Sequence, residues 1–129
     1  MKCFRLLIVL ASVVLLVGCS DHTDVRRTLD EVGAATLREE TITVCHAGFS
    51  HADGEKIPDA QWPESARAFQ PISLWAEPDG AYLLLDSDAD GERGVYLPRF
   101  VSEKDPVCGP TLTHEKLADG VYWYERKRQ

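Results

Sequence analysis

The chain has 129 residues, with 14 Lys and Arg against 21 Asp and Glu, so its formal net charge is −7. This charge argues against binding to nucleic acid and against electrostatic docking on anionic lipid, because both would repel an acidic protein. The length suits one modest domain with its own hydrophobic core and does not comfortably hold a second one.

Residues 1–18 have the pattern of a secretory signal peptide that is removed. Lys2 and Arg5 precede an unbroken run of apolar or small residues, residues 6–17. A helix of about 12 residues rises only about 18 Å, well short of the roughly 30 Å hydrocarbon core of a bilayer, so this run is too short to span a membrane. Removal of Lys2 and Arg5 takes the net charge from −7 to −9.

The apolar run ends in Leu16-Val17-Gly18-Cys19, which resembles the lipobox of bacterial lipoproteins. The resemblance implies that Cys19 carries three acyl chains and becomes the new N-terminus, and several chains on one residue make release from a membrane very slow. In Gram-negative lipoproteins, Asp directly after this Cys typically retains the protein in the inner membrane. Here that residue is Ser20, so we expect a periplasm-facing anchor in the outer membrane; the alternative is a plain signal peptide cut elsewhere.

Beyond a short tether at residues 19–23, we expect a single periplasmic domain over residues 24–129. Apolar residues recur at near-helical spacing from Val25 to Leu37 and predict an amphipathic helix over 24–38, which Gly33 weakens. Alternation with β-branched residues predicts a strand over 40–46.

Residues 47–61 have no sustained period and predict a loop, and Pro63 begins a short helix that ends before Pro71. A strong turn at residues 77–80 predicts a hairpin of strands 72–76 and 81–85. Further strands are predicted at 94–97 and 121–126.

A Gly-x-Tyr motif recurs at Gly80–Tyr82, Gly94–Tyr96 and Gly120–Tyr122. Gly permits the preceding turn and Tyr covers a half-buried sheet face, so each motif marks the start of a strand. The elements together predict an α+β fold, in which one or two helices pack on an antiparallel sheet of four or five strands.

Residues 62–99 also resemble uncharacterised small bacterial envelope proteins. The resemblance rests on a proline-ended short helix, Pro63 to Pro71, an Asp-Gly hairpin, Asp79 to Tyr82, and a Gly-aromatic strand closing in Leu-Pro, Gly94 to Pro98. It implies an envelope fold and brings no activity with it.

After the signal peptide is removed and Cys19 is acylated, Cys45 and Cys108 are the two cysteines left in an oxidising compartment. We therefore expect them to form one disulfide. The alternative is a zinc site made by Cys45, His46, His51 and Cys108, although the spacing of these residues matches no standard zinc signature.

The segment Asp86 to Gly91 has carboxylates at alternate positions followed by Gly, as in the first half of an EF-hand loop. It predicts a weak structural calcium site formed by Asp86, Asp88, Asp90 and Glu92, and no other cofactor is expected. The bidentate Glu of an EF-hand is replaced by Leu97, and the flanks look like strands, so an ordinary solvated hairpin tip is the alternative.

No catalytic motif is found, and we do not expect an enzyme. Ser50, His51 and Asp53 are nearly adjacent, whereas the members of a catalytic triad normally converge from separate elements.

The final predicted strand contains Tyr122, Trp123 and Tyr124, of which one aromatic set could form a recognition patch. The sequence thus predicts an outer-membrane lipoprotein with a protein-binding or accessory domain, whose partners are the membrane, through its lipid, and a cationic envelope protein. The alternatives are a calcium-stabilised structural domain and an inhibitor or immunity-type binder of a cationic hydrolase or toxin.

Overall fold

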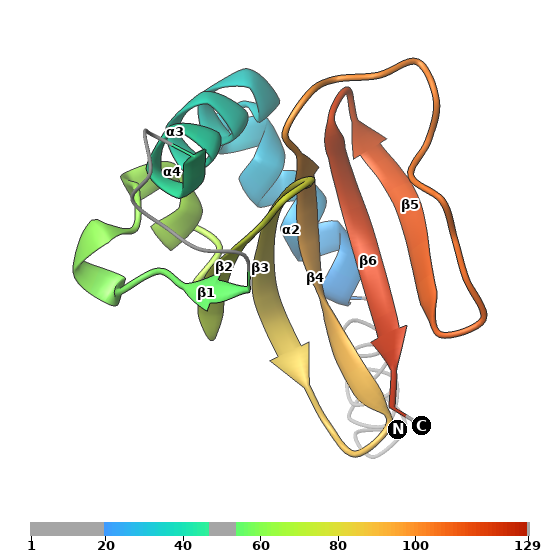
Figure 1. Cartoon of the computed structure of the whole chain (residues 1–129). Coiled ribbons are helices and arrows are strands. Elements are labelled where there is room, and N and C mark those ends of the chain that lie inside the picture. The colour runs from blue at the N-terminus through green and yellow to red at the C-terminus, as the bar shows by residue number, and fades with distance from the viewer. Residues whose placement is uncertain (1–19, 47–53, 129) are drawn as a thin grey trace, which may run out of the picture.

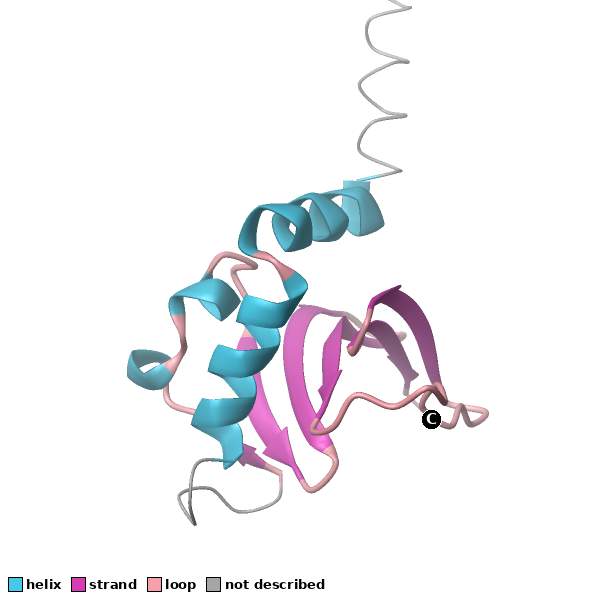
Figure 2. Cartoon of the chain, turned by 90° about the horizontal axis from the view of Figure 1, so that it is seen from above, coloured by secondary structure: helices cyan, strands magenta, loops and turns pink. Residues whose placement is uncertain are grey.

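The computed structural model describes residues 20–46 and 54–128, which form one antiparallel sheet with helices on one of its faces (Figure 1). Seen from above, the helices of the described residues lie on one side of the curved sheet, and none of them covers the opposite face (Figure 2). The molecule therefore has a helix-covered face and a helix-free face, and the candidate site lies on the second.

The helical layer comes from the N-terminal third of the chain. Helix α2 (Ser20–Val32) and helix α3 (Ala34–His46) are separated by Gly33, whose φ of 89° lies in the left-handed region that glycine adopts most easily. A 3-10 turn, η1 (Asp59–Gln61), and a single-turn helix, α4 (Glu64–Arg67), follow. Pro63 stands directly before α4, where its missing N–H costs nothing.

The sheet has six strands in the order β1-β2-β3-β4-β6-β5, and every neighbouring pair is antiparallel. Because β5 lies at the edge and β6 lies inside, the connection from β4 to β5, residues 99–111, crosses one end of β6 (Figure 1). We call this connection the 99–111 loop. The strand bounds are β1 (Glu55–Lys56), β2 (Ser73–Glu77), β3 (Gly80–Ser87), β4 (Gly91–Pro98), β5 (Leu112–Ala118) and β6 (Val121–Lys127).

The main core lies between the helices and the back of the sheet. It contains a row of paired residues, Leu74, Leu83, Val95 and Trp123, one from each of the strands β2, β3, β4 and β6. Leu37 of α3 packs into the same cluster and is fully buried. Burial of such side chains contributes roughly 1.5–3 kcal/mol each, so this core is the chief stabilising element of the domain.

The predicted strand over 40–46 is wrong, because these residues belong to helix α3. Leu37, Thr41 and Cys45 are the buried residues of that helix, and their spacing of four places them on one helical face. Packing of this face against the sheet overrides the strand preference of the β-branched residues. The predicted helix over 24–38 is likewise two helices, and α2 begins at Ser20, inside the segment expected to be a tether.

The expected sheet of four or five strands with one disulfide is wrong on both counts. The sheet has six strands, because β1 and β5 form its two edges and neither was expected. The cysteines are unpaired: Cys45 is buried in α3 with 1% of its surface exposed, whereas Cys108 is exposed in the 99–111 loop. The buried helix face and the surface loop keep the two thiols apart, and a disulfide requires close Cα atoms.

Candidate functional site

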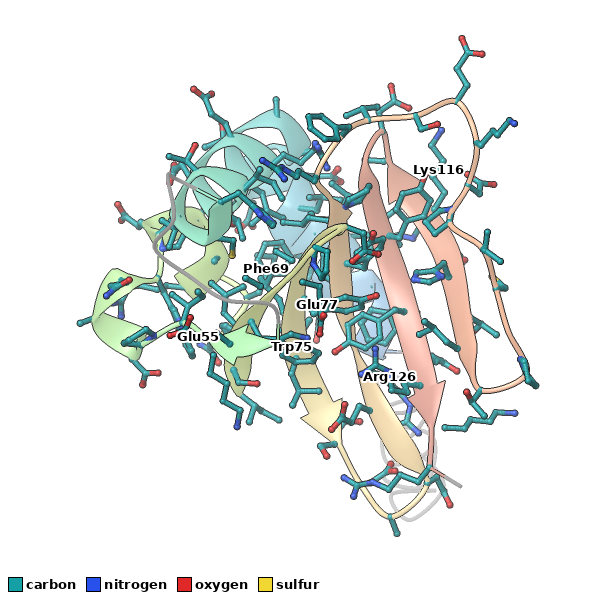
Figure 3. The ribbon with its side chains drawn as sticks, in the orientation of Figure 1. Glu55, Phe69, Trp75, Glu77, Lys116 and Arg126 are labelled. Atoms are coloured by element: carbon teal, nitrogen blue, oxygen red, sulfur yellow. The ribbon has the colours of Figure 1, made fainter. Side chains whose placement is uncertain are left out.

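The helix-free face carries a row of aromatic residues in exact strand register. Trp75 of β2 pairs with Tyr82 of β3, Tyr82 with Tyr96 of β4, and Tyr96 with Tyr122 of β6. We call Trp75, Tyr82, Tyr96 and Tyr122 the aromatic row. Figure 3 shows the labelled Trp75 on the face of the sheet turned to the viewer, whereas α2 lies behind the sheet.

The rings of the aromatic row pack against one another. Trp75 and Tyr82 are stacked with centroids 5.3 Å apart and an interplanar angle of 8°, and the rings of Tyr82 and Tyr96 lie 4.6 Å apart. Tyr124, from the next position on this face, meets Tyr82 edge-on at 4.9 Å. Such contacts contribute about 0.5–1.5 kcal/mol each beyond the burial of area, so the rings close this face without help from a helix.

The polar tips of the row are held by carboxylates at its edges. Tyr96 Oη donates a hydrogen bond to Asp79 Oδ2 at 2.8 Å, and Tyr122 Oη donates to Asp105 Oδ1 at 3.3 Å. Burial, followed by the hydrogen bond to Asp79, raises the pKa of Tyr96 well above its ordinary value. Both hydroxyls therefore stay protonated, and each fixes a negative charge beside the row.

A cation already lies on the row. The guanidinium carbon of Arg126 is 5.4 Å from the centre of the Tyr82 ring, within the range of a cation–π contact. Figure 3 shows the labelled Arg126 and Glu77 over the same face of the sheet. Glu77 Oε1 accepts a hydrogen bond from the indole nitrogen of Trp75 at 3.1 Å. The faces and edges of these rings are thus used for charged groups as well as for packing.

A groove of about 310 Å³ lies between the row and the 99–111 loop, and we call it the tyrosine groove. Tyr82, Tyr96, Tyr122 and His114 of β5 contribute its aromatic side chains from the sheet. The remaining lining comes from the strand ends and the loop: Asp79, Pro98, Phe100, Ser102, Lys104, Pro106, Val107 and Leu112. Its volume falls at the lower end of the range for small-ligand sites, enough for one large side chain or a small molecule.

The 99–111 loop also carries most of the exposed large apolar side chains. Phe100 is 75% exposed, Val101 59% and Val107 90%, and Ile72 is the one other large hydrophobic residue that is exposed in the described part of the chain. Arg38 of α3 donates to the carbonyl of Arg99 at 3.5 Å, which ties the start of the loop to the helical layer. The loop thus exposes apolar side chains, and its first residue is hydrogen-bonded to helix α3.

His114 lies in the groove with both ring nitrogens lacking a hydrogen-bond partner among residues 20–46 and 54–128. Its ring is 5.1 Å from that of Tyr96. Burial lowers the pKa of His114, so the ring is neutral near pH 7 and offers one acceptor nitrogen and one N–H donor. The Oη of fully buried Tyr124 likewise has no partner among the same residues.

The structure brings the predicted calcium ligands Asp86 and Asp88 together around an arginine. Arg93 Nη1 lies 3.0 Å from Asp86 Oδ2 and 2.9 Å from Asp88 Oδ2. The other oxygen of Asp88 accepts the backbone N–H groups of Asp90 and Gly91, as in an ordinary Asx turn. The hydrogen bond from Arg93, and after it the two backbone hydrogen bonds, lower the pKa of Asp88.

Asp90 and Glu92 do not join that cluster in the described contacts, and no three His, Cys, Asp or Glu side chains form a metal-binding group within residues 20–46 and 54–128. His46 Nε2 lies 3.0 Å from the carbonyl of Gly80. Of the proposed zinc ligands, Cys45 is buried and Cys108 exposed. Burial raises the pKa of Cys45 to about 12, which makes its thiolate scarce.

The three residues of the candidate recognition patch alternate between the two faces of the sheet, as the sequence predicts. Trp123 packs into the helix-covered core, whereas Tyr122 and Tyr124 belong to the aromatic cluster on the helix-free face. All three are buried, with at most 4% of their surface exposed. Tyr122 takes part in the candidate site through the wall of the tyrosine groove.

Several sequence-predicted residues lie outside the described residues: the lipidation residue Cys19, the signal peptide 1–18, and Ser50, His51 and Asp53. Where the structure describes the chain, no helix is long and apolar enough to cross a membrane.

Sequence reasoning missed His114, Asp79, Asp105 and the 99–111 loop as parts of a site. The recurring Gly-x-Tyr motif was the available signal, because its three tyrosines are the three neighbours Tyr82, Tyr96 and Tyr122 of the aromatic row. Comparisons of the chain with protein-family models, curated proteins and solved structures give no significant match.

Proposed function

We propose that this chain is a lipid-anchored protein of the bacterial cell envelope, and that its domain binds a cationic protein partner through the tyrosine groove and the 99–111 loop. The observation that carries the binding role is the placement of Phe100 and Val107, which expose apolar surface and line the aromatic groove. Clustered exposed apolar groups on a water-soluble surface are typical of an interaction site.

The anchor rests on the sequence at the N-terminus. Lys2 and Arg5, the apolar run and the tetrad ending in Cys19 support acylation of that cysteine, and Ser20 supports the outer membrane as its destination. The excess of carboxylates over Lys and Arg supports a cationic partner. An acidic surface attracts a cationic protein, which speeds their encounter, and it repels acidic competitors.

The anchor is tested by expressing the full chain and its Cys19→Ser variant in bacteria with a palmitate analogue. We expect the label to enter the parent chain and to fractionate with the outer membrane. The variant should stay unlabelled and leave the membrane fraction. Equal membrane association of both chains would overturn the anchor.

The binding role is tested by capture from envelope extract, with the full chain held in detergent as bait. We expect one cationic protein to be retained at low salt and lost at high salt, because its attraction to an acidic surface is screened. Val107→Ser should reduce the capture severalfold, because Val107 lines the groove and is exposed. Ile72→Ser is the control, because Ile72 is also an exposed aliphatic residue but lies outside the loop. Equal losses in both variants, or none in either, would contradict this binding surface.

A further inference from the structure

The tyrosine groove is surrounded by groups that attract positive charge. Tyr82, Tyr96 and Tyr122 contribute ring systems, and a cation is attracted to the face of such a ring. The carboxylates of Asp79 and Asp105 are fixed at its edge by tyrosine hydroxyls, and each tyrosine occupies one oxygen of its carboxylate. A carboxylate has a second oxygen that can accept a further hydrogen bond.

His114 adds a neutral acceptor to the same space. Its ring lies against Tyr96, and neither of its nitrogens has a partner among the described residues. Burying such a nitrogen without a hydrogen bond costs free energy, so a donor placed in the groove would be stabilised there. The ring is also uncharged, so it adds no repulsion against a cation.

The geometry of the row favours a planar cation. Arg126 already places its guanidinium 5.4 Å from the ring of Tyr82, which shows that this surface accommodates such a group. A guanidinium stacks on aromatic rings and donates in a fixed fork to carboxylates, whereas an ammonium is a compact, strongly hydrated charge. Asp79 and Lys104 are the charged side chains that line the groove and balance each other, and Asp105, which accepts the Tyr122 hydroxyl beside it, adds one negative charge next to the groove.

We propose that the tyrosine groove is the receptor for one guanidinium group, the side chain of an arginine that the partner presents. Asp79 and Asp105 pair with its N–H donors, and the rings of His114, Tyr96 and Tyr122 line the groove around it. This inference deepens the proposed function, because the arginine belongs to the cationic partner. It identifies the anchor residue of that interface, and Arg is common among such anchors.

The test uses a small probe and needs no partner. N-acetyl-arginine amide is titrated into the full chain in detergent while the ring resonances of His114 and Tyr96 are followed by NMR. We expect saturable shifts with a dissociation constant of about 1–10 mM, the weak range for a single side chain. N-acetyl-citrulline amide, the uncharged isostere, should bind at least about tenfold more weakly, as loss of a paired charge costs on this scale.

Three variants test whether charge in the groove controls the affinity for arginine amide. Asp79→Asn should weaken arginine-amide binding severalfold, whereas Lys104→Gln should strengthen it, because it removes a repelling charge from the groove. Misfolding would not produce opposite effects in two exposed substitutions. Asp86→Asn is the matched control: it removes the same charge at the far hairpin tip, where Asp86 pairs with Arg93, and should leave binding unchanged.

Lack of saturable shifts, equal binding of citrulline amide, or weaker binding after Lys104→Gln would each overturn the guanidinium site. The two proposals fail separately. Arginine-amide binding without capture of any envelope protein would retain the site and refute the partner. Capture that depends on the 99–111 loop, without arginine-amide binding, would retain the partner and refute the site.

Discussion

The two faces of the sheet are both closed to water, but by different means. On the helix-covered face, the row Leu74, Leu83, Val95 and Trp123 is closed by helices that pack against it. The next row of the same strands, on the opposite face, is the aromatic row, whose members are at most 9% exposed without a helix over them. The first face depends on another layer, whereas the second is closed by its own rings.

This difference explains why the site lies where it does. Aliphatic side chains have no polar group, so a face built from them stabilises the fold and offers a ligand little besides apolar contact. Tyrosines bury their rings and still present hydroxyls at the edge, where Asp79 and Asp105 meet them. A helix-free aromatic face can therefore be stable while the carboxylates at its edge remain available to a partner.

The largest expected contrast is in cysteine reactivity. Cys45 lies in the helix-covered core with a pKa of about 12, whereas Cys108 is exposed in the 99–111 loop. Burial holds the pKa of Cys45 far above pH 8, so its thiolate is scarce at that pH, and the thiolate is the species that reacts. Brief treatment of the native protein with iodoacetamide should thus modify Cys108 and spare Cys45, as measured by peptide mass mapping. Rapid labelling of both thiols would show that the core opens readily, and lack of labelling at Cys108 would contradict its exposure in the 99–111 loop.

Removing a side chain from the helix-covered face should destabilise the domain strongly. Leu37→Ala leaves a cavity in a fully buried site and should lower the free energy of unfolding by about 2–5 kcal/mol. Chemical denaturation measures this change. Ile72→Ala, at an exposed position, is the control and should cost less than about 0.5 kcal/mol. A cost for Leu37→Ala as small as that of the control would show that the helices contribute little to this face.

Removing one ring from the aromatic row should cost less than the cavity. Tyr82→Leu keeps an apolar side chain but loses the ring contacts with Trp75, Tyr96 and Tyr124. We expect a loss of about 2 kcal/mol in the free energy of unfolding, since each aromatic pair contributes roughly 0.5–1.5 kcal/mol beyond area. A neutral result would mean that burial alone, without ring geometry, closes the helix-free face.

The smallest expected effects separate two tyrosine hydroxyls. Tyr96→Phe removes a hydrogen bond to Asp79 and should destabilise the domain by about 1–2 kcal/mol, whereas Tyr124→Phe removes a buried hydroxyl that has no partner in the described chain. The second change should be neutral or stabilise by up to about 1 kcal/mol. Thermal and chemical unfolding of the pair tests this directly, and equal losses would indicate that Tyr124 has a polar partner of its own.

Local signals in the sequence were enough to predict part of the fold. The turn at residues 77–80 marked the β2–β3 hairpin, and β6 appears where the pattern placed it. Strand β4 begins at Gly91, three residues before its predicted start, so Gly94 lies inside the strand and not at its beginning. Strand β5 was missed because Leu112, His114 and Lys116 share one of its faces. This edge strand therefore lacks the alternation of apolar and polar residues from which a strand is predicted. The error at 40–46 has the opposite origin, since a strong local alternation was overridden by the packing of Leu37, Thr41 and Cys45.

The candidate site could not be predicted as a whole, because it depends on register. Tyr82, Tyr96 and Tyr122 are far apart in sequence and meet only when three strands pair as they do. His114 reaches them because the chain crosses β6 before it returns as β5. The Gly-x-Tyr motif indicates that the three tyrosines occupy similar positions in their strands, but it does not predict that these strands are neighbours in the sheet.

Register also limits how the length of this chain can change in evolution. The aromatic row extends to Lys56 on one edge strand and Lys116 on the other, so one line of side chains crosses all six strands. A single inserted residue within β3, β4 or β6 would turn its tyrosine toward the helices and an aliphatic side chain toward the groove. Homologues that keep the groove should therefore differ in length at the 86–91 tip and within the 99–111 loop, while these strands keep a constant number of residues.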